Sequence, residues 1–191
     1  MSFFKMLLAF SPWLSFLIIA RDSLLRLKIG LVVALVLSLI MGLTRMHRGV
    51  ILWVGLLFFG YATSAVLVFN DLSTVKYMGV MANGALAFAA WFSIAIRKPF
   101  TMDYARAHTD PSLWNHPLFI RTNRMLTSVW GVVFTINTLL AWGKMEHVIF
   151  SDLTYELISY AFLISTMAFT SWYPNHAKRQ HEDSLNASAP I

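Results

Sequence analysis

Long uncharged stretches dominate this sequence. Residues 49–69, GVILWVGLLFFGYATSAVLVF, contain no charged side chain over 21 positions. A helix needs about 20 mostly apolar residues to cross the hydrocarbon core of a membrane, where every backbone polar group has to be bonded within the protein. Hydrophobic residues make up 58% of the chain and charged residues 13%, about half the charged share of a soluble globular protein. We therefore predict an all-α integral membrane protein.

Five segments satisfy this length requirement and a sixth is marginal. The predicted spans are 4–20, 29–44, 49–69, 77–96, 124–142 and 154–173. Segment 4–20 is marginal because Ser11 and Pro12 lie inside it, where a proline removes a backbone donor and kinks a helix. The tryptophans fall mostly near span ends and indicate an aromatic belt. We predict one transmembrane domain over 1–173, a bundle of either six helices or five helices with the first segment re-entrant.

Lys and Arg are divided unequally between the two sides that these spans define. With six spans, ten of the 15 lie on the side that holds both termini and the connector 97–124. If segment 4–20 does not cross, the division is nine to six, and the connector again lies on the positive side. Short loops rich in Lys and Arg remain in the cytoplasm, so we expect a cytoplasmic connector. The tail 174–191 is polar, and we expect it to be a disordered cytoplasmic end.

The connector 97–124, RKPFTMDYARAHTDPSLWNHPLFIRTNR, is the candidate surface for contacts outside the bundle. Basic side chains beside a membrane attract anionic lipid headgroups, and the same charges suit a protein partner. The residues that we assign to this lipid- or partner-binding surface are Arg97, Lys98, Asp103, Arg106, Arg121 and Arg124. We give nucleic-acid binding no role, because no basic helix with interleaved aromatic residues occurs outside the apolar segments.

Local signals in the connector predict two short interfacial helices. Thr101 is placed to cap the first helix, and Arg106 and Asp110 have the i, i+4 spacing of an ion pair. Asp110 followed by proline marks the start of the second helix. Thr122 or Asn123 is expected to cap the span that follows.

The connector also contains residue types found in metal and acid–base sites, namely Asp103, His108, Asp110 and His116. Their spacing matches no ligand pattern, because the two histidines are eight residues apart across a proline turn. An enzyme at this face would require the four groups to converge within a few ångströms. We predict no catalytic residue, no metal and no cofactor.

Asn83 and Asn137 are the most polar side chains at the predicted membrane depth. An amide in lipid needs a hydrogen-bond partner, so we expect the two to bond each other across helices. The alternative is that they line the path of a small-solute or lipid transporter or channel. Small residues from Gly79 to Ala90 let helices approach closely and predict that this span packs centrally.

Four short motifs lie within residues 7–173. They are FSPWLSFLII at 10–19, FNDLSTVKYMGV at 69–80, IRKPF at 96–100 and LFIRTNRMLTSVWGVVF at 118–134. In these motifs the chain resembles the intracellular septation protein A family of small multi-pass bacterial inner-membrane proteins. Its connector is longer and more charged than is expected of the family, which indicates a divergent branch.

The resemblance implies a non-enzymatic protein of the bacterial inner membrane, and the distribution of Lys and Arg adds the expectation that both termini are in the cytoplasm. The resemblance also implies a role in envelope maintenance, or as a scaffold for the cell-division and elongation machinery, through contacts with membrane-protein partners. The basic connector adds expected contacts with anionic membrane lipids. The resemblance carries over no catalytic residue.

Overall fold

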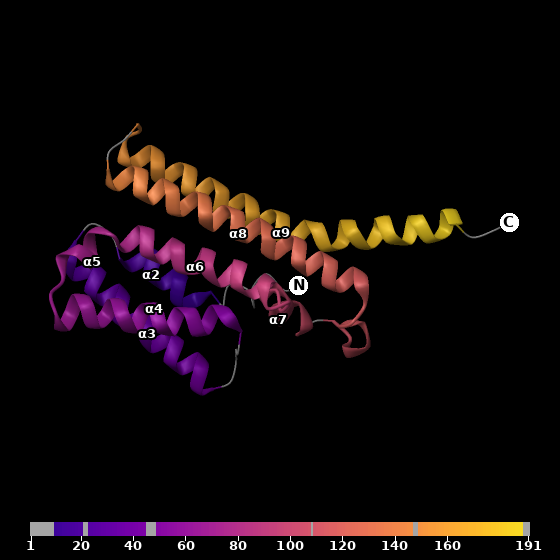
Figure 1. Cartoon of the computed structure of the whole chain (residues 1–191), viewed down its shortest axis with the longest axis horizontal. Coiled ribbons are helices and arrows are strands. Elements are labelled where there is room, and N and C mark those ends of the chain that lie inside the picture. The colour runs from indigo at the N-terminus through magenta and orange to yellow at the C-terminus, as the bar shows by residue number, and fades with distance from the viewer. Residues whose placement is uncertain (1–9, 21–22, 45–48, 108, 147–148, 189–191) are drawn as a thin grey trace.

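The protein was analysed as a computed structural model, which describes residues 10–20, 23–44, 49–107, 109–146 and 149–188, with side chains as far as Gln180. Regular secondary structure in these ranges is entirely helical (Figure 1). In chain order the elements are α2 (Ser11–Ile19), α3 (Leu24–Leu43), α4 (Val50–Thr63), the π-helical η1 (Ser64–Val68), α5 (Leu72–Lys76), α6 (Met78–Ala95), α7 (Phe100–Arg106), the 3-10 turn η2 (Pro111–Leu113), α8 (Pro117–Met145) and α9 (Asp152–Ser188).

Five helices in the described part of the chain are long and apolar enough to cross a membrane. They are Leu24–Leu43, Val50–Val68, Met78–Ala95, Pro117–Met145 and Asp152–Gln180. Each contains most or all of one of the five clear predicted spans. The prediction of an all-helical, multi-pass membrane protein is therefore confirmed at this level.

The sixth predicted span, 4–20, is not confirmed. Residues 4–9 lie outside the described ranges, and α2 is nine residues long, well short of a membrane crossing. Pro12 does not kink this helix, because it lies in the first turn, where a missing N–H costs no hydrogen bond. Trp13 is buried, with its ring 5.3 Å from that of Phe58 and 4.8 Å from that of Phe59. The described part of this segment is thus a short helix packed against α3 and α4, and Trp13 belongs to the core instead of an aromatic belt.

Helix α6 occupies the centre of the bundle, as its small residues predicted. It packs against α8 on one side and α4 on the other (Figure 1). Ala82, Ala89 and Ala90 are buried in these contacts. Small side chains on one helix let its neighbours approach closely, and dispersion contacts then hold the helices together in a lipid environment.

The tail is helical as far as Ser188, so the prediction of a disordered end from residue 174 is wrong over the described residues. Helix α9 continues through Pro174 and projects beyond the start of α8 (Figure 1). Nucleation is the costly step of helix formation, and an existing helix then gains one hydrogen bond for each added residue. The apolar part of α9 provides that nucleus, so the polar residues after it continue the helix.

Candidate functional site

The connector contains one seven-residue helix and one 3-10 turn instead of two interfacial helices. Helix α7 begins at Phe100, immediately after Pro99, which places Thr101 inside the helix and not at its cap. Asp110 does cap the next element, as predicted, and its carboxylate accepts a hydrogen bond from the backbone N–H of Ser112 at 2.8 Å. That element, η2, is only three residues long.

Helix α8 begins earlier than the sequence indicated. His116 is its cap, with Nδ1 accepting from the backbone N–H of Leu118 at 3.2 Å, and Pro117 occupies the first turn. Thr122 and Asn123, the predicted caps, are buried inside the helix. The cap prediction failed because α8 already begins at Pro117, so that the Asn123 amide donates within the helix, to the carbonyl of Phe119 at 2.8 Å.

A buried network of hydroxyl groups explains the position of α7. The Thr101 hydroxyl donates to the backbone carbonyl of Asn123 at 2.9 Å and lies 2.9 Å from the hydroxyl of Thr127. The backbone N–H of Phe100 donates to the Ser93 hydroxyl at 3.1 Å. Because these residues come from α6, α7 and α8, the network fixes the connector against two spanning helices.

The predicted ion pair between Arg106 and Asp110 does not form. The Arg106 guanidinium lies over the ring of Trp114, 5.3 Å from its centroid, and Asp110 accepts from Ser112 instead. Stacking on an indole is a favourable alternative for a guanidinium when it is partly withdrawn from water.

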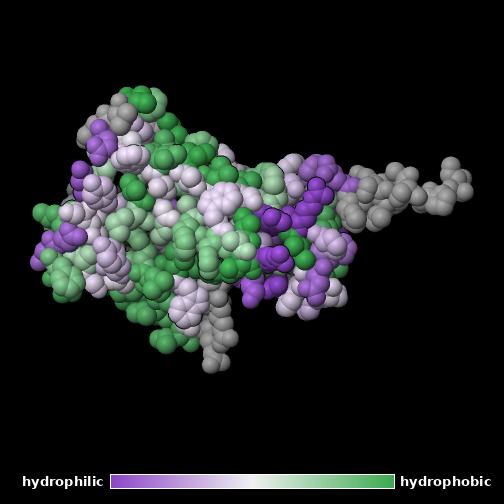
Figure 2. All heavy atoms as spheres, in the orientation of Figure 1, coloured by the Kyte–Doolittle hydropathy of each residue, from purple (hydrophilic) through white to green (hydrophobic). Residues whose placement is uncertain are grey.

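The six residues assigned to the connector surface do lie at one end of the bundle, the end where α6 finishes and α8 begins. Figure 2 shows hydrophilic side chains gathered there, at the base of the projecting part of α9. Most of the six are exposed and Arg106 is half-buried. We call this set the basic connector surface: Arg97, Lys98, Asp103, Arg106, Arg121 and Arg124.

The acid–base residues of the connector do not form a cluster in the described part of the chain, where no group of three or more His, Asp or Glu residues is suited to a metal ion. Asp110 and His116 each cap a different element. His108 lies outside the described residues. Tyr104 is buried beside Phe10 and Phe100, and burial, with a smaller effect from the charge of Asp103, raises the pKa of its hydroxyl. Tyr104 is therefore a neutral core residue and not a base.

Asn83 and Asn137 do not bond each other. The Asn83 amide donates to the carbonyl of Gly79, one turn earlier in α6, at 2.9 Å. Asn137 is buried, and its Oδ1 has no hydrogen-bond partner. An amide that bonds its own helix satisfies its donor without a neighbour, and this local bond replaced the predicted interhelical one.

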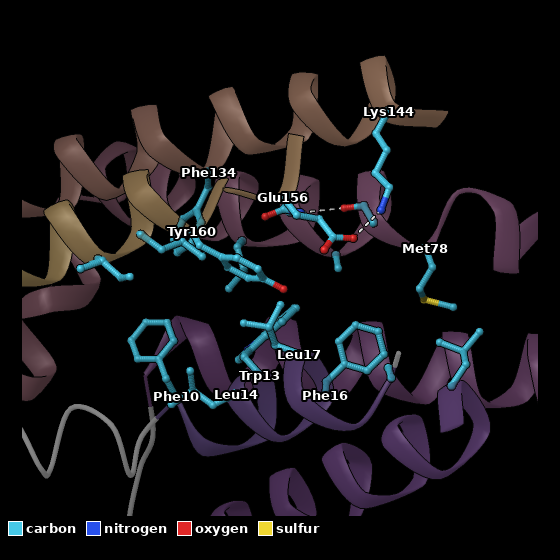
Figure 3. A pocket seen from close by; sticks show the side chains of 18 of the residues that line it. Phe10, Trp13, Leu14, Phe16, Leu17, Met78, Phe134, Lys144, Glu156 and Tyr160 are labelled. Atoms are coloured by element: carbon cyan, nitrogen blue, oxygen red, sulfur yellow. Dashed lines mark hydrogen bonds and ion pairs between the residues drawn. The ribbon is translucent and has the colours of Figure 1, made fainter. Parts of the chain in front are cut away.

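A cavity of about 920 Å³ lies between α2 on one side and α6, α8 and α9 on the other. Figure 3 shows Phe10 and side chains of α2, among them Trp13 and Leu17, facing Phe134 and Tyr160 across this space. The volume is near the upper end of the roughly 300–1,000 Å³ that is usual for small-molecule sites. Asn83 lines the cavity but Asn137 does not.

The walls of the cavity are mainly aromatic and aliphatic. The ring of Phe10 is stacked on that of Trp130, with centroids 5.9 Å apart and planes 19° from parallel. Leu17, Leu24 and Ile164 also line the cavity and are 40%, 45% and 68% exposed. The cavity therefore reaches the apolar outer surface of the bundle.

One end of the cavity is charged. Lys144, in the last turn of α8, and Glu156, in the second turn of α9, form an ion pair with Nζ 2.6 Å from Oε1. The hydroxyl end of Tyr160 points into the cavity below them (Figure 3). This end is opposite to the basic connector surface, because α8 begins at the connector and ends at the ion pair.

The cavity extends along the helix axes. On α9 its lining runs from Glu156 to Met167, and on α2 with its two flanking residues it runs from Phe10 to Ala20. At 1.5 Å per residue these stretches are about 15–16 Å long. The lining on α8 runs from Trp130 to Lys144, about 21 Å, so the cavity extends through about half to two thirds of the ~30 Å hydrocarbon core, somewhat more than one leaflet.

Sequence reasoning did not find this cavity. Its lining comes from α2, the start of α3, α6, α8 and α9, and each segment alone has only the composition of a span. One usable signal was present. Glu156 lies just inside the predicted span 154–173, and Lys144 lies two residues after the end of the preceding predicted span, 124–142. Two antiparallel helices joined by a short loop bring such residues together at the membrane edge.

No family model, curated protein or solved structure matches this chain.

Proposed function

We propose that this is a non-enzymatic, multi-pass protein of the bacterial inner membrane that binds a membrane lipid in the cavity between α2 and α9. In this proposal it acts in envelope maintenance, or as a scaffold for division and elongation machinery, with its basic connector surface in the cytoplasm. The resemblance to the septation protein A family supports the cellular role. The cavity supports the proposal that the protein binds a membrane lipid.

The observation that carries the proposal is a large apolar cavity that reaches the lipid-facing surface of the bundle. Apolar cavities exclude water even when water fits by volume. Inside a membrane the surrounding apolar molecules are acyl chains, and the cavity extends through somewhat more than one leaflet. A lipid chain matches it in polarity, length and availability.

The basic connector surface supports a second contact at the opposite end. Each Lys or Arg beside an anionic leaflet contributes about 1 kcal/mol of attraction. Arg97 and Lys98 directly follow α6 and are exposed, and Arg121 and Arg124 are exposed in the first turns of α8. Charge reversal of Arg97, Lys98 and Arg106 to Glu is expected to weaken the capture of a membrane-protein partner or of anionic lipid.

Lipid retention after purification in mild detergent tests the proposal. Native mass spectrometry of the wild-type protein is expected to show bound phospholipid. Ala82, which is buried and lines the cavity, is replaced by phenylalanine to fill the space. Ala161→Phe is the matched control, since Ala161 is exposed on α9 and does not line the cavity. Retention that is absent in the wild type, or equal in both variants, would overturn the proposal.

Lipid transport is the second candidate, because Asn83 places an amide on the cavity wall. A path for a polar solute is disfavoured, since the wall is mainly apolar and Asn137 is absent from it. The cavity covers somewhat more than one leaflet and not the full membrane, which favours binding over passage. Vesicles containing the reconstituted protein and a fluorescent phospholipid distinguish the two: binding predicts no movement of the label between leaflets, and transport predicts rapid movement.

A further inference from the structure

The charged end of the cavity bears on which lipid it holds. The apolar part cannot select strongly, because the bilayer around it is as apolar as the cavity wall. Discrimination among lipids therefore depends on the polar groups of the protein at the position where the lipid headgroup would lie. Among the residues that the structure describes, the charged groups that line the cavity are Lys144 and Glu156.

We propose that the cavity selects a zwitterionic phospholipid whose headgroup carries a primary ammonium beside its phosphate, and that Lys144 and Glu156 form the headgroup site. This inference rests on the proposed lipid binding and names the class of lipid.

The ion pair retains bonding capacity for such a headgroup. A lysine ammonium has three N–H donors, and one is directed to Glu156 Oε1 at 2.6 Å, which leaves two. Glu156 retains Oε2 and further lone pairs. The two side chains are 34% and 43% exposed, so a headgroup can reach both.

The ion pair and the headgroup are complementary in charge: each has one positive and one negative group, and each group can face one of opposite sign. The phosphate accepts from the Lys144 ammonium, and the headgroup ammonium donates to the Glu156 carboxylate. These are charge-assisted hydrogen bonds, which are stronger than neutral ones. An anionic headgroup without an ammonium would leave Glu156 beside a negative charge. A choline headgroup has no N–H to donate, so it loses the second bond.

The position of the pair suits a lipid of the surrounding leaflet. Lys144 and Glu156 lie at the end of spanning helices α8 and α9, where headgroups are found. Below them the lining of α9 continues to Met167, about 16 Å further along the helix. One acyl chain can lie along this wall while the headgroup remains at the pair.

The test is competition among phospholipids that share the same acyl chains. The wild-type protein is reconstituted with equal amounts of phosphatidylethanolamine, phosphatidylcholine and phosphatidylglycerol, and the retained lipid is identified by native mass spectrometry. We expect the ethanolamine lipid to be preferred. Glu156→Gln is expected to reduce its preference over phosphatidylglycerol by roughly three- to tenfold, because the glutamine carbonyl can still accept from the ammonium but the bond is no longer charge-assisted. Lys144→Gln is expected to reduce retention of every phospholipid.

Matched controls are available at the same end of the molecule. Lys76 and Glu146 are exposed and do not line the cavity, so Lys76→Gln and Glu146→Gln are expected to leave the preference unchanged. Equal retention of the three lipids by the wild type would overturn the inference, as would an unchanged ratio in Glu156→Gln. In both cases lipid remains bound, which distinguishes this failure from failure of the proposed lipid binding itself.

A second measurement avoids disrupting the pair. The variant Lys144→Arg keeps the positive charge beside Glu156 and removes the lysine amine, which would otherwise couple to the Glu156 carboxylate itself. A carbodiimide then joins the Glu156 carboxylate to the ethanolamine amine as an amide, with loss of water to the carbodiimide, which becomes a urea. The expected product is the lipid mass on the peptide containing Glu156. Its absence from ethanolamine-lipid bilayers would overturn the inference, and phosphatidylcholine bilayers, which lack the amine, are the blank.

Discussion

The hydroxyl groups of Thr101 and Thr127 lie 2.9 Å apart in the interior of the protein. Thr101 also donates to the carbonyl of Asn123, so its single proton is used there and the proton between the two hydroxyls belongs to Thr127. This arrangement joins the connector helix α7 to the spanning helix α8. It turns a stretch of polar sequence into a fixed part of the bundle.

Replacing Thr101 by valine is expected to destabilise the protein by about 1–3 kcal/mol, because the buried Thr127 hydroxyl and Asn123 carbonyl lose their partner. Denaturant unfolding in detergent measures the loss, and proteolysis within the connector is expected to accelerate. Thr101→Ser keeps the hydroxyl and is expected to behave much more like the wild type. Equal stability of the valine and serine variants would show that the network does not hold α7.

The contact of Gly131 with Trp91 predicts that alanine is not tolerated there. A Cβ at Gly131 would lie 2.9 Å from Cε2 of Trp91, and the indole N–H is held by the Thr135 hydroxyl at 3.1 Å. Moving the ring breaks this bond, so the overpacking cost of about 1–3 kcal/mol exceeds the gain of about 1 kcal/mol from alanine in a helix. Thermal unfolding of Gly131→Ala is expected to shift to lower temperature.

The control for this prediction is Gly60→Ala in α4. Nothing lies within 4 Å of a Cβ built at Gly60, so only the helix-propensity gain of about 1 kcal/mol remains. The two glycine-to-alanine changes are therefore expected to have opposite signs. If both raise the unfolding temperature, the approach of α6 to α8 is looser than the structure shows.

Trp130 and Thr170 connect α8 to α9 through a buried hydrogen bond. The indole N–H donates to the threonine hydroxyl at 3.0 Å, and both residues are buried. Thr170→Val preserves the shape but leaves the buried indole donor without its acceptor, at a cost of about 1–3 kcal/mol. Thr170→Ser is expected to retain most of the stability. Unfolding by titration with a denaturing detergent measures both, and indistinguishable variants would contradict the prediction.

Acidification is expected to loosen the start of α5. The Thr74 hydroxyl, at 2.7 Å, and the backbone N–H of Ser73, at 2.9 Å, hold the pKa of Asp71 below its ordinary value of 3.8. Because the folded-state pKa is the lower one, the cap contributes fully above the ordinary value. Its contribution is lost as the pH falls from 3.8 through the folded-state pKa.

The measurement is amide hydrogen exchange at Ser73 and Thr74, compared at each pH with the variant Asp71→Asn. Asparagine also caps helices but does not titrate. We expect the wild type to lose protection relative to this variant below about pH 4. A constant ratio of the two exchange rates between pH 6 and pH 3 would show that Asp71 does not support α5 through its charge.

The predictions that the structure confirms depend on residues that are close together in the sequence. The five long helices follow from apolar length alone, and Asp110 caps η2 because the cap and the N–H that it accepts from are two residues apart. The failures concern side chains whose partners are remote. Thr101 has the local signal of a cap, but its hydroxyl is bonded to α8, 22 residues away.

The intramembrane amides show the same contrast between what local sequence predicts and what contacts with other helices determine. That Asn83 and Asn137 lie within spans was readable from hydropathy, and both do lie in helices of spanning length. Which atoms they face depends on the rotation of α6 and α8 about their axes. Asn83 bonds its own helix and lines the cavity, while Asn137 Oδ1 is buried without a partner.

Apolar length in the sequence is enough to predict a helical protein with five segments able to cross a membrane, because lipid requires every backbone group to be bonded within a segment of sufficient length. The sequence also predicts that the basic residues of the connector lie together at one end of two spans. Three features are visible only in the packed helices: α2 is short and packs into the core, α7 is fixed to α8, and a cavity ends at Lys144 and Glu156. These features are contacts between helices that lie far apart in the chain. They depend on how the helices are rotated and packed, which apolar composition leaves open.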